Sequence, residues 1–476
     1  MFYLSKYRTL SVSQKAAIWY IACNILQKGI AFLVVPIYVR LLTTSEYGQY
    51  TIFQSWCGII AIFATLNLHC GVYTKAMVDY ADDRDRYTSS MQVLSSLITI
   101  LLFLVYLLAS GWWESRLEMD NVTIMLMFLY FLTFPSFSFW SVRQRVENKY
   151  KIMVLLTLAL SIVTPAISLY LLFCTDLRVN AVIWGYLLSQ ICFGAFFYVF
   201  QLIKGRCFYH RHYWIHALHF NIPLLPHYLS LVVLSQIDRI LIGNYCGKDK
   251  AGIYGLAVQI AMVISIFFSG INSSFVPWIY EKFKSKDFES VKIQTKRLCI
   301  VAGIIVLSYM LIVPEIVQIM GTSEYREAIW VVPAISLSVY VTFCYGLYAC
   351  VEFYYNETTY VMIATTSGAF LSLALNIVLL PIFGYISAGY TSLLCYTFFM
   401  LMHYFFQQKI SNKTLDGISI FDNRFIWSSC LVLFVLMLLC LLTYTASLIR
   451  YTLIILSLVL MFVYKGKIVS TLKVSK

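Results

Sequence analysis

Long apolar segments recur along the whole chain, and they constrain its fold more than any other feature. Runs of about twenty residues, the length a helix needs to cross the hydrocarbon core of a bilayer, follow one another from roughly residue 16 to residue 464. Charged residues make up only 12% of the 476 residues, about half the fraction found in soluble proteins. A membrane β-barrel would show alternating segments of about ten residues instead. The pattern therefore predicts an all-α polytopic membrane protein.

We expect about fourteen transmembrane helices, joined by connections too short to hold a large soluble domain on either face. The first apolar run is too long for a secretory signal and is not followed by a small-residue cleavage site, so it is expected to be a span. The predicted spans are residues 16–39, 48–76, 88–112, 121–142, 152–174, 180–203, 222–245, 252–280, 293–320, 327–351, 358–383, 386–408, 425–446 and 450–464.

The distribution of lysine and arginine predicts the orientation of these spans. With the N-terminus inside, 26 of the 35 Lys and Arg residues fall in cytoplasmic segments and seven in outer segments. Cytoplasmic loops of membrane proteins carry this excess of positive charge. Both termini are therefore predicted to be cytoplasmic, and the net charge of +13 requires no nucleic-acid partner.

A polar break in the middle of the chain, residues 204–221, separates six predicted spans from the next six. The loops after the first and seventh spans are both followed by Tyr-Gly, at Tyr47-Gly48 and Tyr254-Gly255, as expected for a duplicated unit. Transporters with such repeats place their substrate site between the halves. The predicted domains are an N-terminal six-helix bundle (1–203), a cytoplasmic linker (204–221), a C-terminal six-helix bundle (222–410), and two additional helices with a basic tail (411–476).

Three charged residues lie deep within predicted spans. Lys28 is about twelve residues into the first span, or ~18 Å along a helix axis, and Asp238 and Arg239 lie inside the seventh. Ionisable residues at such depth usually face a bundle interior or a watery cavity. Adjacent residues project about 100° apart on a helix, so Asp238 and Arg239 each need another partner, and Lys28 is a candidate partner for Asp238.

Two interpretations of these charges remain open. In the first, Lys28 and Arg239 line a central cavity that attracts anions, since Arg makes forked contacts with phosphate oxygens, and Asp238 serves the cavity or couples transport to protons or sodium. In the second, all three form a buried ion-pair network that keeps the bundles in register. Weaker candidates are Arg40, at the outer end of the first span, and the span histidines His69 and His227.

The sequence contains no pattern for a catalytic group, a metal or a cofactor. It has no P-loop or nucleotide-binding fold, so direct ATP hydrolysis is not expected. Glu315 and Glu352 lie near span ends, where we expect them to be close to water, and no role is assigned to them. Six span cysteines are expected to be small buried hydrophobic residues: Cys57, Cys192, Cys299, Cys344, Cys395 and Cys440.

Two stretches of the sequence resemble a known family of transporters. They are NILQKGIAFLVVPIYVRLLTTSEYGQY (Asn24–Tyr50) and IPLLPHYLSLVVLSQIDRILIGNYCGKDKAGIYGLA (Ile222–Ala257). Both resemble Wzx-type polysaccharide flippases of the multidrug/oligosaccharidyl-lipid/polysaccharide exporter (MOP) superfamily. The resemblance covers the layout of the first twelve spans, whereas strong residue patterning is confined to these two stretches.

The resemblance implies two six-helix bundles around a central cavity, which turn a polyprenyl-diphosphate-linked oligosaccharide across the cytoplasmic (inner) membrane of a bacterium by alternating access. Such activity serves the biosynthesis of surface polysaccharide, such as O-antigen of lipopolysaccharide, or capsule. The implied partners are the lipid-linked oligosaccharide and membrane lipid, and they can include a coupling ion (proton or sodium) and a polysaccharide polymerase.

Three alternatives to this function remain. A peptidoglycan-precursor flippase also has fourteen spans, but the first two spans here lack a set of several cavity arginines. A drug/cation antiporter of the same superfamily is expected to favour acidic cavity residues over Lys28 and Arg239. A membrane-embedded polysaccharide polymerase or glycosyltransferase is expected to carry a sizeable outer loop with catalytic arginines, and the predicted outer segments are short.

Overall fold

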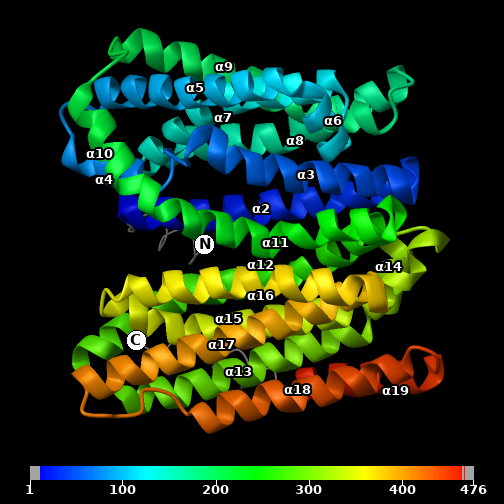
Figure 1. Ribbon diagram of the computed structural model, residues 1–476. Coiled ribbons are helices and arrows are strands. Elements are labelled where there is room, and N and C mark those ends of the chain that lie inside the picture. Colours follow the sequence, from blue (N-terminus) through cyan, green and yellow to red (C-terminus); the bar gives the residue numbers. More distant parts are fainter. Residues whose placement is uncertain (1–10, 464–465, 467–476) are drawn as a thin grey trace, which may run out of the picture. The chain divides into compact units, whose positions relative to one another are not determined.

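The computed structural model describes residues 11–463 and residue 466. In that part of the chain all regular secondary structure is helical (Figure 1), which confirms the predicted all-α fold. The elements are α2 (Val12–Leu41), α3 (Thr44–Thr65), α4 (Gly71–Asp79), α5 (Arg84–Leu108), α6 (Ser110–Leu117), α7 (Asn121–Val146), α8 (Tyr150–Cys174), α9 (Val179–Gly205), α10 (Arg211–Asn221), η1 (Ile222–Leu224), α11 (Leu225–Cys246), α12 (Lys248–Ser285), α13 (Phe288–Leu311), α14 (Val313–Met320), η2 (Ser323–Trp330), α15 (Val332–Tyr354), α16 (Thr358–Phe383), α17 (Ile386–Thr414), α18 (Asn423–Thr443) and α19 (Ser447–Val463).

Eleven candidate membrane spans are found among the described residues. The chain is therefore a multi-pass membrane protein, but the count of fourteen spans is not confirmed. Of the remaining predicted spans, α3 and α17 are long enough but lack as apolar a stretch, and α19 has 17 residues. The polar residues in α3 and α17 thus have to be satisfied by neighbouring helices, since the bilayer core offers no hydrogen bonds.

Two predicted spans are interrupted, and the predicted linker contains a helix. The span expected at 48–76 breaks after α3, where Leu66 and Asn67 adopt positive φ angles of 47° and 49° and the backbone leaves the helical path. The span expected at 293–320 divides into α13 and α14 at Pro314, which has no N–H to continue the first helix. In the linker, α10 buries Tyr213 and Ala217, four residues apart, on one face.

Aspartate side chains cap the N-termini of three helices. Asp120, Asp287 and Asp422 each accept a hydrogen bond from the backbone N–H three residues later, at the starts of α7, α13 and α18. Such caps satisfy N–H groups that the first helical turn leaves unpaired. At Asp287, the ammonium group of Lys282 and the cap bonds to Ser290 lower the carboxyl pKa to about 2.

The chain forms two compact units. The first unit comprises residues 1–34 and 49–232, and the second comprises residues 35–48 and 233–476. In the first unit α9 packs against α5, α7 and α8, as Figure 1 shows. Glycines allow this close packing, because a Cβ at Gly194 would lie 2.6 Å from the Thr133 carbonyl and one at Gly185 would lie 2.4 Å from Ser168 Cα. Small residues at helix contacts are a common packing device in membranes.

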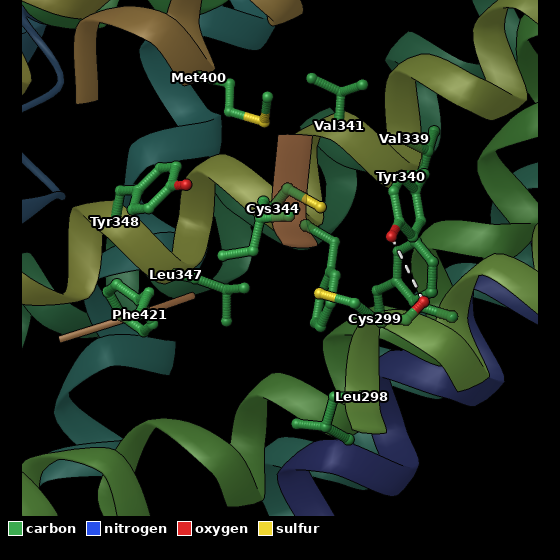
Figure 2. Packing of buried hydrophobic residues seen from close by; sticks show 14 of the residues in the cluster. Leu298, Cys299, Val339, Tyr340, Val341, Cys344, Leu347, Tyr348, Met400 and Phe421 are labelled. Atoms are coloured by element: carbon green, nitrogen blue, oxygen red, sulfur yellow. Dashed lines mark hydrogen bonds between the residues drawn. The ribbon is translucent and has the colours of Figure 1, made fainter. Parts of the chain in front are cut away.

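In the second unit α15 is the most buried span, and it packs against α12, α13, α16, α17 and α18. Figure 2 shows part of the apolar core around it, where the sulfur atoms of Cys299, Cys344 and Met400 lie among aliphatic and aromatic side chains. The Tyr340 hydroxyl donates to the Cys299 carbonyl oxygen at 3.3 Å. Of the six span cysteines expected to be buried, five are; Cys192 is exposed on α9, so that prediction is wrong for it.

The short segment 35–48, the end of α2 and the start of α3, belongs to the second unit. The backbones of this segment and of the start of α12 lie close together. A Cβ added at Gly48 would lie 1.7 Å from the Lys248 carbonyl oxygen, and one added at Gly252 would lie 2.1 Å from the Thr44 carbonyl oxygen. Only glycine leaves room for such an approach. The two helix starts, α3 and α12, are those that carry the repeated Tyr-Gly pairs.

Candidate functional site

Asp238 joins four helices of the second unit. It lies in α11, is 5% exposed, and accepts hydrogen bonds from Tyr254 Oη at 2.6 Å, Asn376 Nδ2 at 2.9 Å and Ser392 Oγ at 3.0 Å. These donors come from α12, α16 and α17. Hydrogen bonds to a carboxylate are stronger than those between neutral groups. The side chain is therefore solvated by neutral donors in place of water.

Arg239, the next residue, is 8% exposed, and its guanidinium turns back along its own helix. One Nη donates to the Ser235 carbonyl oxygen at 3.2 Å and to the Gln236 side-chain oxygen. Among the described residues of the second unit, Arg239 forms no ion pair. Its charge acts on the neighbouring carboxylate of Asp238 without an ion pair between them. A buried guanidinium outside an ion pair can still attract an anion, because burial reduces screening by water.

Lys28 lies in α2, in the first unit, and is partly exposed. It forms no ion pair with the described residues of that unit. A partnership of Lys28 with Asp238 stays a prediction, since the two residues belong to different units. Within the second unit, Asp238 is satisfied by Tyr254, Asn376 and Ser392.

Arg40 lies at the end of α2 and within the second unit. Its Nη2 donates to the carbonyl oxygen of Ile319 at 2.6 Å, in the last turn of α14. A cation at a helix C-terminus satisfies a free carbonyl and interacts favourably with the helix dipole. Through this contact Arg40 anchors the end of α2 to the end of α14.

The two histidines among the weaker candidates both lie in the first unit. His69 lies between α3 and α4, with its ring edge-on to Phe134 at 5.4 Å and to Phe139 at 6.4 Å. Its Nδ1 is buried and has no hydrogen-bond partner in the part of the chain that the structure describes. His227 lies in the first turn of α11, partly buried, with its ring 6.0 Å from that of Tyr228.

The fold brings together several polar residues that the sequence did not predict as neighbours. Tyr254, Asn376 and Ser392 surround Asp238, but single neutral residues in apolar spans gave no pattern that linked them. Glu352, expected to be near water, is fully buried against His403. A signal was available, because the predicted topology puts the ends of spans 327–351 and 386–408 on the same side of the membrane.

The fold is similar to that of solved membrane proteins. Three solved structures are similar: lipid II flippase MurJ in an inward closed conformation (TM-score 0.64, 14% identity, covering 95% of this chain and 99% of that one), a MOP superfamily transporter from Pyrococcus furiosus (0.59, 13%, 84% and 96%), and an outward-facing multidrug resistance MATE family transporter of the MOP superfamily (0.55, 14%, 84% and 97%). At these identities the likeness concerns the fold.

The sequence itself defines the family. Residues 13–283 match the model of the polysaccharide biosynthesis protein family, so the chain belongs to that family, and residues 223–382 also match the MatE family model. The predicted resemblance to MOP-superfamily polysaccharide flippases is confirmed. Family and fold indicate a flippase or transporter rather than an enzyme.

Two curated proteins of Haemophilus influenzae are also similar. The Lsg locus putative protein 1 is 25% identical over 288 residues, which are 57% of this chain and 67% of that protein. An uncharacterized membrane protein is 23% identical over 279 residues, which are 56% of this chain and 64% of that protein. The matched region thus spans about two thirds of each relative.

Proposed function

We propose that this protein turns a polyprenyl-diphosphate-linked oligosaccharide repeat unit across the bacterial cytoplasmic membrane for the synthesis of a surface polysaccharide, O-antigen or capsule. It works by alternating access of two six-helix bundles (1–203 and 222–410) about a central cavity, with both termini in the cytoplasm. The lipid tail stays in the bilayer while the head group crosses. A polysaccharide polymerase then consumes the product outside.

One observation carries this proposal: Arg239 is a buried cation that forms no ion pair with the described residues of its unit. A diphosphate head group loses its hydration on entering a membrane protein, and a fixed guanidinium offsets that loss through forked, charge-assisted hydrogen bonds. Lys28, which is partly exposed, also forms no ion pair with the described residues of the first unit and is proposed to act with Arg239. The membership of the polysaccharide biosynthesis protein family supports the class of cargo.

Asp238 is proposed to serve energy coupling rather than cargo binding. Its carboxylate is reached by Tyr254, Asn376 and Ser392, and the buried side-chain oxygen of Asn376 has no hydrogen-bond partner among the described residues. A carboxylate exchanges protons, and carboxylate, amide and hydroxyl oxygens ligate small hard cations. A proton or sodium ion bound here would bias one state of the transport cycle over another.

A second candidate function, a peptidoglycan-precursor flippase, is favoured by the fold similarity to lipid II flippase MurJ over 95% of this chain. That cargo is also a polyprenyl diphosphate, so Arg239 fits it equally well. A drug/cation antiporter fits less well, because a buried unpaired Arg repels a cation.

The test is transfer in proteoliposomes. A fluorescent undecaprenyl-diphosphate oligosaccharide is supplied on one face, and its arrival on the other is measured for the wild type, Arg239→Ala and Lys28→Ala, with lipid II as a second cargo. The matched control is Arg326→Ala, an exposed arginine of η2 in the same unit as Arg239.

We expect both cavity variants to transfer at least about tenfold more slowly, since a hydrogen bond to a charged group contributes ~1.5–3 kcal/mol, and the control to be unchanged. Normal transfer by both cavity variants would contradict the cationic cavity. Transfer of lipid II alone would favour the second candidate, and transfer of neither cargo would contradict the flippase.

A further inference from the structure

A second pair of ionisable side chains lies inside the second unit, apart from Asp238 and Arg239. Glu352 Oε1 and His403 Nδ1 are 2.7 Å apart, and the two side chains are 0% and 1% exposed. Glu352 lies in the last turn of α15, and His403 lies in α17. Complete burial of two ionisable groups is costly unless they are paired, so the pair needs a structural or functional reason.

Aromatic rings and unpartnered polar atoms surround this pair. The His403 ring stacks on Tyr345 at 5.2 Å and on Phe399 at 6.1 Å, both with an interplanar angle of 11°. Within the described residues, Glu352 Oε2 has no hydrogen-bond partner, and neither has the side-chain amide of Gln407, one turn after His403 and fully buried. Buried polar atoms are rarely left unpaired without a reason. The free Oε2 marks a place for one more proton.

No other charge compensates the pair. Neither Glu352 nor His403 has a further ion pair in residues 11–463. Several charged side chains on the elements around α15 and α17 are engaged elsewhere: Lys282 with Asp287, Lys292 with Glu289, Lys296 with Asp422, Lys413 with Glu357, and Lys409 over the Tyr360 ring. Glu281, Lys284, Arg297 and Arg424 also lie on the helices around the pair, but they are exposed and form no ion pair with Glu352 or His403. Other titratable groups near the pair in sequence on the two helices are the phenols of Tyr345, Tyr348, Tyr354, Tyr396 and Tyr404 and the thiols of Cys350 and Cys395.

The number of protons on the pair fixes its charge. With one proton, the pair is neutral, either as carboxylate and imidazolium or as carboxylic acid and imidazole. A second proton, transferred from a hydronium ion that becomes water, leaves the pair as carboxylic acid, with the new O–H bond at Oε2, and imidazolium, with a net positive charge. A buried uncompensated charge is strongly unfavourable, so the doubly protonated pair is stable only where water reaches the contact between α15 and α17.

We propose that Glu352 and His403 form a proton-binding site, and that proton binding there is linked to opening of the α15–α17 contact. Its role in transport rests on the proposed function. In that role the proton is the coupling ion, and a proton taken up outside and released inside drives the cargo outward. A metal ion does not fit, because hard cations take about six oxygen ligands and no cluster of three ligating side chains exists among the described residues.

The proton site is tested without any cargo. Infrared difference spectra of the full-length protein in lipid, recorded between two pH values, report the C=O stretch of a carboxyl group that gains a proton. The expected result is a carboxyl band in the wild type that is lost in Glu352→Gln and shifted in His403→Gln. The matched control is Glu357→Gln, three residues beyond α15, whose carboxylate pairs with Lys413 at 3.3 Å.

Retention of the full band in Glu352→Gln, or its loss in Glu357→Gln as well, would overturn the site. Variants are compared only where their size-exclusion profiles match the wild type. Glu352→Asp keeps a titratable carboxyl group, and a shifted band in it is expected.

Coupling is tested in proteoliposomes with an imposed pH gradient and the fluorescent undecaprenyl-diphosphate oligosaccharide. The wild type is expected to transfer faster with the gradient than without it, and Glu352→Gln is expected to lose this acceleration while it still equilibrates the cargo. An unchanged acceleration in Glu352→Gln would overturn the coupling role. If the wild type transfers no cargo at all, the proposed function fails, and the infrared result alone decides whether the pair binds a proton.

Discussion

Asp238 is stabilised by donors from three other helices, so each donor contributes to the stability of the second unit. Tyr254→Phe removes the 2.6 Å bond to Oδ2 and leaves a buried carboxylate with one donor fewer. We expect a loss of about 1.5–3 kcal/mol in the free energy of unfolding, the range for hydrogen bonds to charged groups. The measurement is the thermal unfolding midpoint of the purified protein in detergent.

The control for this change is Tyr170→Phe. Tyr170 is 67% exposed on α8, and no hydrogen bond to its hydroxyl is found in the described part of the chain. Its midpoint is expected to equal that of the wild type. Equal midpoints for Tyr254→Phe and Tyr170→Phe would show that the Tyr254 bond contributes nothing.

At the residue scale, the buried charged residues could be identified from the sequence, but the residues that contact them could not. Asp238 and Arg239 were recognisable because ionisable residues are rare in spans. Their neighbours were not, because Tyr254, Asn376 and Ser392 are types that occur throughout these spans. Glu352 was misjudged for a different reason: its place near a span end predicted access to water, and packing of α15 against α17 removed it.

At the scale of the element, the contact between the starts of α3 and α12 depends on glycine. A Cβ at Gly252 would lie 2.1 Å from the Thr44 carbonyl oxygen, so Gly252→Ala must push the two helices apart. Forcing extra atoms into a packed contact costs about 1–3 kcal/mol. We expect a lower unfolding midpoint, measured as for Tyr254→Phe.

Gly270→Ala is the matched control, since it lies on the same helix with nothing within 4 Å of an added Cβ. Alanine in an open helical position is expected to stabilise by about 0.5–1 kcal/mol. The two substitutions should therefore move the midpoint in opposite directions. A higher unfolding midpoint for both variants would show that the α3–α12 contact accommodates the added methyl group without loss of stability.

The cap of α13 makes stability depend on pH. Because the folded-state pKa of Asp287 is lowered to about 2, chiefly by Lys282, its contribution is complete above the ordinary aspartate pKa of about 4 and is lost as the pH falls toward 2. We expect the unfolding midpoint of Asp287→Asn to be lower at pH 7 and to change less between pH 4 and pH 2.

Asparagine is itself a good helix cap, so this variant removes the charge and keeps the cap geometry. Asp416→Asn is the control, because the carboxylate of Asp416 is exposed and has no ion pair in the described residues. A pH profile of Asp287→Asn that follows the wild type would rule out the Asp287 contribution.

At the scale of the whole molecule, the predicted orientation can be tested with the native cysteines. Cys174 is exposed at the end of α8, which the charge distribution puts on the outer side. A membrane-impermeant maleimide is expected to label it in intact cells and to label Cys174→Ser much less. Lys284→Cys in the Cys174→Ser background, near the end of α12, is expected to react only after permeabilisation. Labelling of Lys284→Cys in intact cells, with Cys174 labelled only after permeabilisation, would show that the orientation is the opposite of the predicted one.

The overall class could be predicted from the sequence because it follows from patterns summed over many residues. Apolar runs identified a polytopic helical protein, and two quoted stretches identified its superfamily. The assignment of residues 35–48 to the second unit could not be predicted. It depends on backbone contacts of Gly48 and Gly252. Contacts between two helices cannot be predicted from the hydrophobic periodicity within either helix.

The polarity of α17 has a consequence for how the protein is made. This helix carries His403 and Gln407 and is not among the eleven apolar spans, so it gains less from entering lipid than its neighbours do. Its packing partners α15 and α16 precede it in the chain, and the ribosome therefore delivers them to the membrane first. Insertion of α17 is then a docking step against protein, and the order of synthesis is part of the information that folds the second unit.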